Sequence, residues 1–314
     1  MRTLEIVHRT RYDYAEPVVL ADYRLMFRPR DSHDLRLLHT GLVIDPVAQV
    51  RWIHDPFGNS IAIASFPDTP VKVLELVSTI QLEHYGVPPD LQPIEDYARK
   101  LPFSYLAEEA PDLVRYVERH YPDPNAMVSN WARQFLDGEG EAANDTFGTL
   151  TRMCKGIQET LNYAMRFEIG TQPPALTLET GGGTCRDYAL LMMEGVRSLG
   201  IAARFVTGYL YDPVLDKAEG EQETHAFPHA WIEVYLPGAG WIEFDPTNGI
   251  IGTERLIRVA VGRDPEQAMP IKGSFIGPPG VAIEATVDVY VRSMAPASEP
   301  EARVEMPANV APAG

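Results

Sequence analysis

The sequence predicts an α+β protein in which an N-terminal antiparallel β sandwich or meander precedes a core of helices packed on an antiparallel sheet. Apolar and polar residues alternate through most of residues 1–85, and a period of two is typical of half-buried strands. Beyond residue 86 the apolar positions become spaced by three and four, which indicates amphipathic helices. Alternating segments return after residue 200. Strands followed by helices and further strands are the pattern of an α+β fold.

Residues 1–85 are expected to form the N-terminal β domain. Alternating segments follow one another at short intervals, and turn sequences such as Asp55-Pro56-Phe57-Gly58-Asn59 separate them. Short strands at this spacing favour a sandwich or a meander. The six predicted strands span residues 2–12, 18–27, 35–44, 50–54, 60–65 and 71–82.

Residues 86–148 are expected to be a helical connection. Short helices are predicted over 112–120 and 125–136, with Asn125 as the N-cap of the second. A longer amphipathic helix is predicted from Thr149 onward. Cys154 lies on the apolar stripe of that helix, where a free cysteine is usually a buried core residue.

The core is expected to span residues 149–292. The glycine run 181–183 leads into a second helical stripe, and Gly200 is placed to end that helix as its C′ residue. A strand is predicted over 201–211. Two further strands, 229–235 and 241–245, flank Pro237-Gly238-Ala239-Gly240, which is typical of a hairpin turn. A late strand is predicted over 281–291, and the Ala-, Pro- and Glu-rich segment 293–314 is predicted to be a disordered tail.

The charge of the chain disfavours two classes of partner. With 27 basic and 44 acidic residues the formal charge is −17, which repels nucleic-acid phosphates and anionic membrane surfaces. No run approaches 18 apolar residues and the first residues lack the apolar region of a signal peptide, so we expect a cytoplasmic protein. Two cysteines, Cys154 and Cys185, cannot form a disulfide framework or a four-thiolate zinc site.

Cys185 is the strongest candidate for chemistry. It follows the glycine run at the expected start of a helix, where unpaired backbone N–H groups favour negative charge. Such a position favours the thiolate, which is the nucleophilic form of cysteine. From these residues alone, a buried helix-start cysteine is an equally good interpretation.

A thiolate nucleophile needs a partner that accepts and returns a proton, and imidazole suits that task near neutral pH. His229 begins a predicted strand, whereas His225 precedes it and is more consistent with the rim of a site. Asp245 ends the next strand before Pro246, and a carboxylate there would hold the imidazole in one tautomer. The alternative for Asp245 is a simple Asp-Pro turn.

Three blocks of sequence resemble bacterial transglutaminase-like proteins, a family within the papain-like cysteine-protease superfamily. The blocks occur in the order found in that family, and the strand-rich start resembles the β domain that precedes such cores. They read Gly-Gly-Gly-Thr-Cys-Arg-Asp-Tyr (181–188), Leu-Gly-Ile-Ala-Ala-Arg-Phe-Val-Thr-Gly-Tyr-Leu (199–210), and His-Ala-Trp-Ile-Glu-Val-Tyr (229–235) with Trp-Ile-Glu-Phe-Asp-Pro-Thr-Asn (241–248).

The resemblance implies a catalytic triad with Cys185 as nucleophile, His229 as base and acid, and Asp245 as the orienting carboxylate. The backbone N–H of Cys185 is the natural first oxyanion donor. Family members often carry a side-chain amide shortly before the cysteine, but Glu179, Thr180 and three glycines stand there. The second donor is left open among distant amides, which are Gln158, Asn162 and Gln172. Asp187 is expected to have a structural role.

The expected reaction is thiol-dependent acyl transfer at an amide bond of a peptide or protein substrate, through a thioester acyl-enzyme. Transfer to water would make the protein a cysteine peptidase or amidase, which we favour because water is always present. Transfer to an amine would make it a transglutaminase. A non-catalytic peptide-binding module is the third possibility. No cofactor is expected, and metal binding through Cys185, His225, His229 and Asp245 is disfavoured because Pro228 opposes the helix it requires.

Three further points depend on the fold. His229 and Asp245 share one face of the hairpin only if the connection has an odd length or a bulge intervenes. Tyr209 and Trp231 either line a cleft or belong to the core. The acidic segment 212–224 is either a lid that selects substrates or a solvated insertion.

Overall fold

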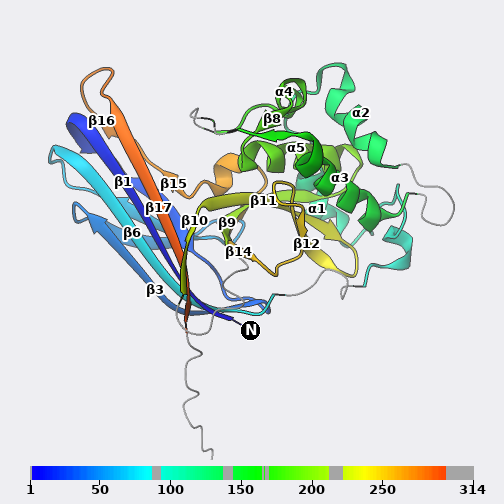
Figure 1. Cartoon of the computed structure of the whole chain (residues 1–314), viewed down its shortest axis with the longest axis horizontal. Coiled ribbons are helices and arrows are strands. Elements are labelled where there is room, and N and C mark those ends of the chain that lie inside the picture. The colour runs from blue at the N-terminus through cyan, green and yellow to red at the C-terminus, as the bar shows by residue number, and fades with distance from the viewer. Residues whose placement is uncertain are drawn as a thin grey trace, which may run out of the picture.

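The computed structural model describes residues 2–86, 93–136, 144–164, 166, 170–211 and 222–294. Figure 1 shows the long strands of the N-terminal part on one side, and five helices gathered around a shorter sheet on the other. The predicted α+β class is therefore confirmed. Within the described residues no helix is both long and apolar enough to span a bilayer.

The N-terminal part is a sandwich of two antiparallel sheets. One has the strand order β10-β17-β1-β6-β3 with β16 beside β1, and the other has the order β15-β2-β5-β4. Apolar side chains from both sheets, among them Tyr14, Leu25 and Leu74, fill the space between them. Six strands come from the start of the chain: β1 (Arg2–Leu20), β2 (Tyr23–Arg28), β3 (Leu35–Asp45), β4 (Gln49–His54), β5 (Ser60–Ser65) and β6 (Val71–His84).

Two features of this sandwich differ from the sequence expectation. The single strand predicted over 18–27 is two strands, because β1 ends at Leu20 and β2 begins at Tyr23. The late strand is present as β17 (Ile283–Met294), and it pairs with β1 from Thr3 opposite Met294 to Tyr14 opposite Ile283. It therefore completes the N-terminal sheet, and β10 (Gln222–Ala226) lies on its other side. The domain limits 1–85, 86–148 and 149–292 stay predictions. Most of the acidic segment 212–224 and of the predicted tail 293–314 lies outside the described residues, which omit 212–221 and 295–314; residues 222–224 begin β10 and residues 293–294 end β17.

The second half is a five-stranded antiparallel sheet covered by helices. Its strand order is β13-β12-β11-β9-β14, and α5 lies across β11 and β9 (Figure 1). The remaining elements are α1 (Ala110–Val117), α2 (Met127–Arg133), α3 (Thr146–Thr160), α4 (Pro174–Thr180), α5 (Cys185–Ser198), β7 (Asn162–Tyr163), β8 (Gly182–Gly183), β9 (Ala203–Leu210), β11 (Pro228–Leu236), β12 (Gly240–Asp245), β13 (Ile250–Ile251), β14 (Leu256–Gly262), β15 (Ile271–Lys272), β16 (Phe275–Ile276), and the 3₁₀ turns η2 (Asp96–Ala98), η3 (Pro124–Ala126), η4 (Gln134–Leu136) and η7 (Pro265–Ala268).

The predicted N-cap of the second helix is wrong. Asn125 has a positive φ of 56° within η3, so its side chain does not cap α2. The Asp123 carboxylate does so instead, because it accepts hydrogen bonds from the backbone N–H groups of Val128 at 2.8 Å and Ser129 at 3.1 Å. Asparagine and aspartate are both favourable N-cap residues, so the residue type alone does not distinguish Asn125 from Asp123. The backbone turn before α2 brings the Asp123 carboxylate to the free N–H groups. Helix α4 was not predicted.

Helix α5 is the centre of the core. Its residues from Asp187 to Arg197 are buried, and Leu190, Met193 and Val196 pack in one apolar cluster with Phe205 of β9 and Ile232 of β11. Each such side chain contributes roughly 1.5–3 kcal/mol through its burial. The helix is therefore held rigidly along its length, which fixes the position of the residue at its start.

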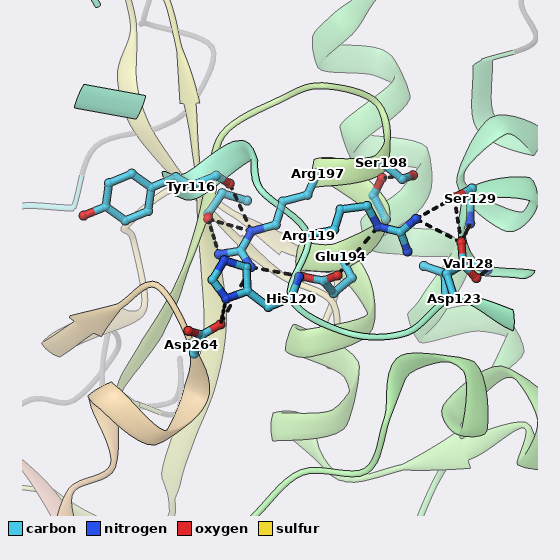
Figure 2. Close-up of polar contacts among 12 residues, drawn as sticks. Tyr116, Arg119, His120, Asp123, Val128, Ser129, Glu194, Arg197, Ser198 and Asp264 are labelled. Carbon is cyan, nitrogen blue, oxygen red and sulfur yellow. Dashed lines mark hydrogen bonds and ion pairs between the residues drawn. The ribbon is translucent and has the colours of Figure 1, made fainter. Parts of the chain in front are cut away.

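A buried polar network anchors the last turn of α5 (Figure 2). The Arg197 guanidinium is fully buried and pairs with Glu194 at 3.0 Å. It also donates to the carbonyl oxygens of Tyr116 at 3.0 Å, Ala203 at 3.0 Å and Arg263 at 2.5 Å. A buried guanidinium without such partners would be strongly destabilising. The network thus ties α5 to α1, to β9 and to the segment after β14.

The two halves of the molecule share an apolar interface. Leu4, Ile6 and Val291 of the N-terminal sheet pack against Tyr209 of β9 and Ile257 of β14. Polar contacts add to this packing. The buried Asn59 side chain donates to the Val261 carbonyl at 2.7 Å and accepts from the Val261 N–H at 2.9 Å. The N-terminal sandwich is therefore packed directly on the far edge of the core sheet.

Candidate active site

Cys185 is the first residue of α5, as predicted. Gly181 ends α4 in the left-handed conformation with φ of 66°, and the extended pair Gly182–Gly183 leads to the N-cap Thr184. The Cys185 side chain is partly exposed. As the first helical residue it has a backbone N–H without an acceptor inside the helix. Cys154, by contrast, is fully buried on α3, where burial raises the pKa of its thiol, so its expected core position is confirmed.

The turn before Cys185 is locked by Asp187, one turn into the helix. The Asp187 carboxylate accepts from the Thr184 N–H at 2.9 Å, the Thr184 hydroxyl at 2.8 Å and the Gln172 N–H at 2.8 Å. Arg166 pairs with it at 3.1 Å. Burial raises the pKa of this carboxyl, but these hydrogen bonds outweigh burial and hold the pKa below its usual value. Asp187 therefore supports the nucleophile turn structurally, as expected.

The hairpin of β11 and β12 has the parity that the proposed pairing requires. Ile232 lies opposite Phe244 and Leu236 opposite Gly240, so opposed residues are both even or both odd in number. The connection between the strands has an odd length, residues 237–239. Side chains of like parity therefore share a face, and His229 and Asp245 point to the same side of the sheet.

His229 and Asp245 form a direct, buried pair. The His229 Nε2 atom lies 2.8 Å from Asp245 Oδ2, and the two side chains are 9% and 0% exposed. A carboxylate only accepts hydrogen bonds, so Nε2 carries the proton in this contact. Asp245 Oδ1 accepts from the Thr247 N–H at 2.9 Å. Both oxygens of the carboxylate are thus engaged, which fixes its orientation.

Cys185 completes the arrangement, because its side chain interacts with the His229 ring and contributes to the pKa of that ring. Because Nε2 is bonded to Asp245, Nδ1 is the ring nitrogen left for the sulfur. Burial lowers the pKa of His229, but the Asp245 carboxylate and the Cys185 sulfur outweigh burial and raise it to about 10. Burial raises the pKa of Asp245. The interactions with His229, Asn248 and Thr247 outweigh burial, so the pKa of Asp245 is lowered overall. The Asp245 carboxylate therefore favours the protonated form of the His229 imidazole.

The face beneath His229 is built from aromatic packing. The rings of His229 and Trp231 are stacked with centroids 5.9 Å apart, and Trp231 is fully buried. Gly208 lies opposite His229 on β9, and a Cβ there would come within 2.8 Å of the Trp231 ring and 2.0 Å of the Ile257 carbonyl oxygen. Only glycine fits this close approach. Trp231 and Tyr209 are therefore core residues and do not line an open cleft.

The other sequence candidates are spread over several segments of the chain. His225 lies in β10, paired with Tyr290 of β17. In the part of the chain that is described, no group of three His, Cys, Asp or Glu side chains is arranged to hold a metal ion. The Gln172 amide nitrogen donates to the Thr177 hydroxyl at 2.9 Å and the Gly182 carbonyl at 2.8 Å. Gln158 donates to the Asn248 carbonyl at 3.0 Å.

Two residues near the triad were not singled out from the sequence. Asn248 donates to Asp245 Oδ2 at 2.7 Å, and its Nδ2 atom lies 3.3 Å from His229 Nε2. Its place in the Asp-Pro-Thr-Asn turn was a usable signal, because a turn returns the third residue after an aspartate towards that aspartate. Tyr163 lies beside the nucleophile turn, where it is paired with Gly183. It belongs to a two-residue strand, which left no pattern to detect.

Two segments of the chain match models of known protein families. Residues 4–83 match the model of the bacterial transglutaminase-like N-terminal region, and residues 129–246 match that of the transglutaminase-like superfamily. The resemblance to transglutaminase-like proteins seen in the sequence is therefore confirmed for these two segments of the chain.

Individual relatives show how far the similarity extends. An uncharacterized protein of Mycobacterium tuberculosis is 28% identical over 305 residues, covering 90% of this chain and 91% of the relative. One from Mycobacterium leprae is 37% identical over 107 residues, which are 34% of this chain and 37% of that protein. A protein-glutamine gamma-glutamyltransferase of Pseudomonas aeruginosa is 40% identical over 70 residues, which are 22% of this chain but 10% of that enzyme.

Among solved structures, that of "a Putative Cysteine Protease from Cytophaga hutchinsonii" has the same fold. It superimposes with a TM-score of 0.69 at 18% sequence identity, covering 95% of this chain and 93% of the other. At this identity the likeness concerns the fold. It extends over the N-terminal sandwich and the core together.

Proposed function

We propose that the protein is a cysteine peptidase or amidase whose nucleophile is Cys185, with His229 as base and acid and Asp245 as the orienting carboxylate. The observation that carries the proposal is the bonding of His229, whose Nε2 contacts Asp245 at 2.8 Å while the ring also contacts the Cys185 thiol. Nothing in the packing of a core sheet requires these three side chains to meet at a partly exposed position.

The first half of the reaction follows from the charges of the site. The Cys185 thiol gives its proton to His229 Nδ1, and the thiolate sulfur attacks an amide carbonyl carbon to form an S–C bond. The carbonyl π electrons move to oxygen and give a tetrahedral oxyanion. On collapse the C–N bond breaks, and the imidazolium returns its proton to the departing amine. Asp245 stabilises the imidazolium throughout, which is consistent with the raised pKa of His229.

In the second half the thioester is released by a new nucleophile. We propose water, activated by the neutral imidazole, so that the product is a carboxylic acid. The competing proposal is an amine nucleophile, which would give an isopeptide bond. Its support is the 40% identity over 70 residues with an enzyme named protein-glutamine gamma-glutamyltransferase. The two outcomes use the same triad and differ only in the group that attacks the thioester.

The experiment that tests the proposal incubates a defined peptide mixture and a primary amine with the wild type and with the Cys185→Ala variant. Mass spectrometry distinguishes the outcomes. New peptide termini or deamidated side chains that depend on Cys185 are the expected result. Amine adducts formed with loss of ammonia would show that the reaction is transamidation and not hydrolysis. Identical mixtures from both proteins would reject an enzyme and favour peptide binding.

A further inference from the structure

Tyr163 lies directly beside the nucleophile turn. Strand β7 runs parallel to β8, with Tyr163 paired with Gly183, and the Ala164 N–H donates to the Gly183 carbonyl at 3.0 Å. The Tyr163 ring meets the Tyr188 ring edge-on, with centroids 6.3 Å apart. Tyr188 follows Cys185 by one helical turn, so the Tyr163 side chain covers the exposed side of the first turn of α5.

The Tyr163 hydroxyl is available as a donor. The residue is 53% exposed, so its ring is not needed to fill the core. Partial burial first, and then the charge of the Cys185 sulfur, raise the pKa of the phenol. The hydroxyl therefore keeps its proton at neutral pH.

The other side chains considered as the second oxyanion donor are the amides of Gln172, Gln158 and Asn162. Both N–H groups of the Gln172 amide are used by Thr177 and Gly182. The Gln158 amide is bonded to the Asn248 carbonyl. Asn162 precedes Tyr163 in β7, and consecutive residues of a strand point to opposite sides. Tyr163 therefore remains as the candidate donor beside the nucleophile turn.

We propose that the Tyr163 hydroxyl is the second oxyanion donor, acting together with the backbone N–H of Cys185; this inference rests on the proposed function. In the resting site the Tyr163 ring lies beside the first turn of α5, which begins at Cys185. When the S–C bond forms, the sulfur becomes neutral and the electron pair of the carbonyl π bond moves to the neighbouring oxygen. The hydroxyl then donates to that oxygen without a large movement, so the donor follows the charge.

The test compares two reactions of the same sulfur in the Tyr163→Phe variant. Acylation of Cys185 by p-nitrophenyl acetate passes through an oxyanion, whereas alkylation by iodoacetamide displaces iodide at a saturated carbon and does not. We expect Tyr163→Phe to slow acylation roughly 100-fold, the usual loss on removing one oxyanion donor. Alkylation should stay within about threefold, because the thiolate itself is retained. The substitution is not otherwise disruptive, since the ring contact with Tyr188 does not use the hydroxyl.

Tyr97→Phe is the matched control, because Tyr97 is 39% exposed and its hydroxyl contacts Glu109 away from the triad. Equal slowing of acylation and alkylation in Tyr163→Phe would overturn the inference and make Tyr163 a positioning residue for the sulfur. Unchanged acylation would remove Tyr163 from the reaction. Peptide turnover by the wild type is measured in parallel. Its absence, together with a selective acylation defect in Tyr163→Phe, would reject the hydrolase while leaving the donor in place.

Discussion

The Asn248 side-chain amide donates a 2.7 Å hydrogen bond to Asp245 Oδ2, the same oxygen that receives the His229 Nε2 proton at 2.8 Å. One carboxylate oxygen therefore serves both the imidazole and a neutral amide. The amide stabilises the ionised carboxylate and contributes to its lowered pKa. It also restricts the carboxylate to the orientation in which it meets the imidazole.

Removing this amide should weaken the reaction without abolishing it. A hydrogen bond to a charged group contributes about 1.5–3 kcal/mol, so Asn248→Ala is expected to lower kcat roughly 10- to 100-fold. Steady-state kinetics on a peptide substrate measures the effect. Asn130→Ala, at an exposed position of α2, is the control and should leave kcat unchanged. Equal kcat for Asn248→Ala and wild type would show that Thr247 alone orients Asp245.

The raised pKa of His229 predicts a pH profile and its change on mutation. Activity needs the imidazolium, so it should fall as the pH rises through about 10. In Asp245→Asn burial dominates the pKa of His229, and the alkaline limb should move to lower pH while kcat falls by roughly 10³-fold or more. The dependence of kcat/KM on pH measures both. An unshifted alkaline limb in Asp245→Asn would exclude Asp245 as the source of the raised pKa.

The same pKa makes a prediction about stability. The folded pKa of His229 is above its ordinary value of 6.5, so the native state binds more protons than the unfolded chain between those values. The stabilisation is complete below pH 6.5 and is lost as the pH rises towards 10. Urea unfolding of the wild type should show this decline, and Asp245→Asn should show a smaller one. A wild-type curve that is flat or rises over this interval would contradict the raised pKa.

The two cysteines should differ sharply in reactivity. Cys154 is fully buried and its thiol pKa is raised by that burial, whereas Cys185 is partly exposed beside an imidazolium. Iodoacetamide should therefore modify native Cys185 at least about 100-fold faster than Cys154, and His229→Ala should remove most of that advantage. Peptide mass spectrometry over time measures both rates. Labelling of Cys185 that is independent of His229 would argue against a thiolate–imidazolium pair.

Glu233 and Glu243 lie directly opposite each other in β11 and β12, and both are buried. Their pKa values are shifted in opposite directions. Glu233 pairs with Arg204 and Arg258, and these contacts overcome burial and lower its pKa. Burial raises the pKa of Glu243 far above 4.5, Arg258 only partly offsets this, and the charge of Glu233 adds to it. The sheet therefore holds one carboxylate and one protonated carboxyl group against a shared arginine.

Glutamine substitutions at these two positions should behave differently. Native Glu243 keeps its proton where the unfolded chain has lost it, so wild-type stability falls as the pH rises above 4.5. Glu243→Gln removes this penalty and should gain stability relative to wild type between about pH 5 and pH 8. Glu233→Gln breaks a buried ion pair and should cost about 3–5 kcal/mol at neutral pH. Urea unfolding at both pH values measures each, and equal pH dependence in wild type and Glu243→Gln would contradict a protonated Glu243.

Much of the local structure was accessible from residue patterns. The alternation in residues 1–85 predicted the strands of the sandwich, and the apolar stripe after the glycine run predicted α5 and its end before Gly200, whose φ is 83°. The parity of His229 and Asp245 predicted the hairpin geometry that the register confirms. These features depend on neighbours within a few residues, where steric and hydrogen-bonding preferences act directly.

Other features arise from contacts between distant segments. The alternation of β17 was visible, but its pairing with β1, about 280 positions earlier in the chain, leaves no local mark because backbone pairing is insensitive to side-chain identity. Tyr163 became a candidate only when β7 paired with β8 beside the nucleophile turn. The amino-acid sequence by itself determined which residues carry reactive groups. It also determined on which face of a strand or helix each of them lies. Which of these faces meet was settled by packing, because burial rewards the assembled surfaces and not the separate segments.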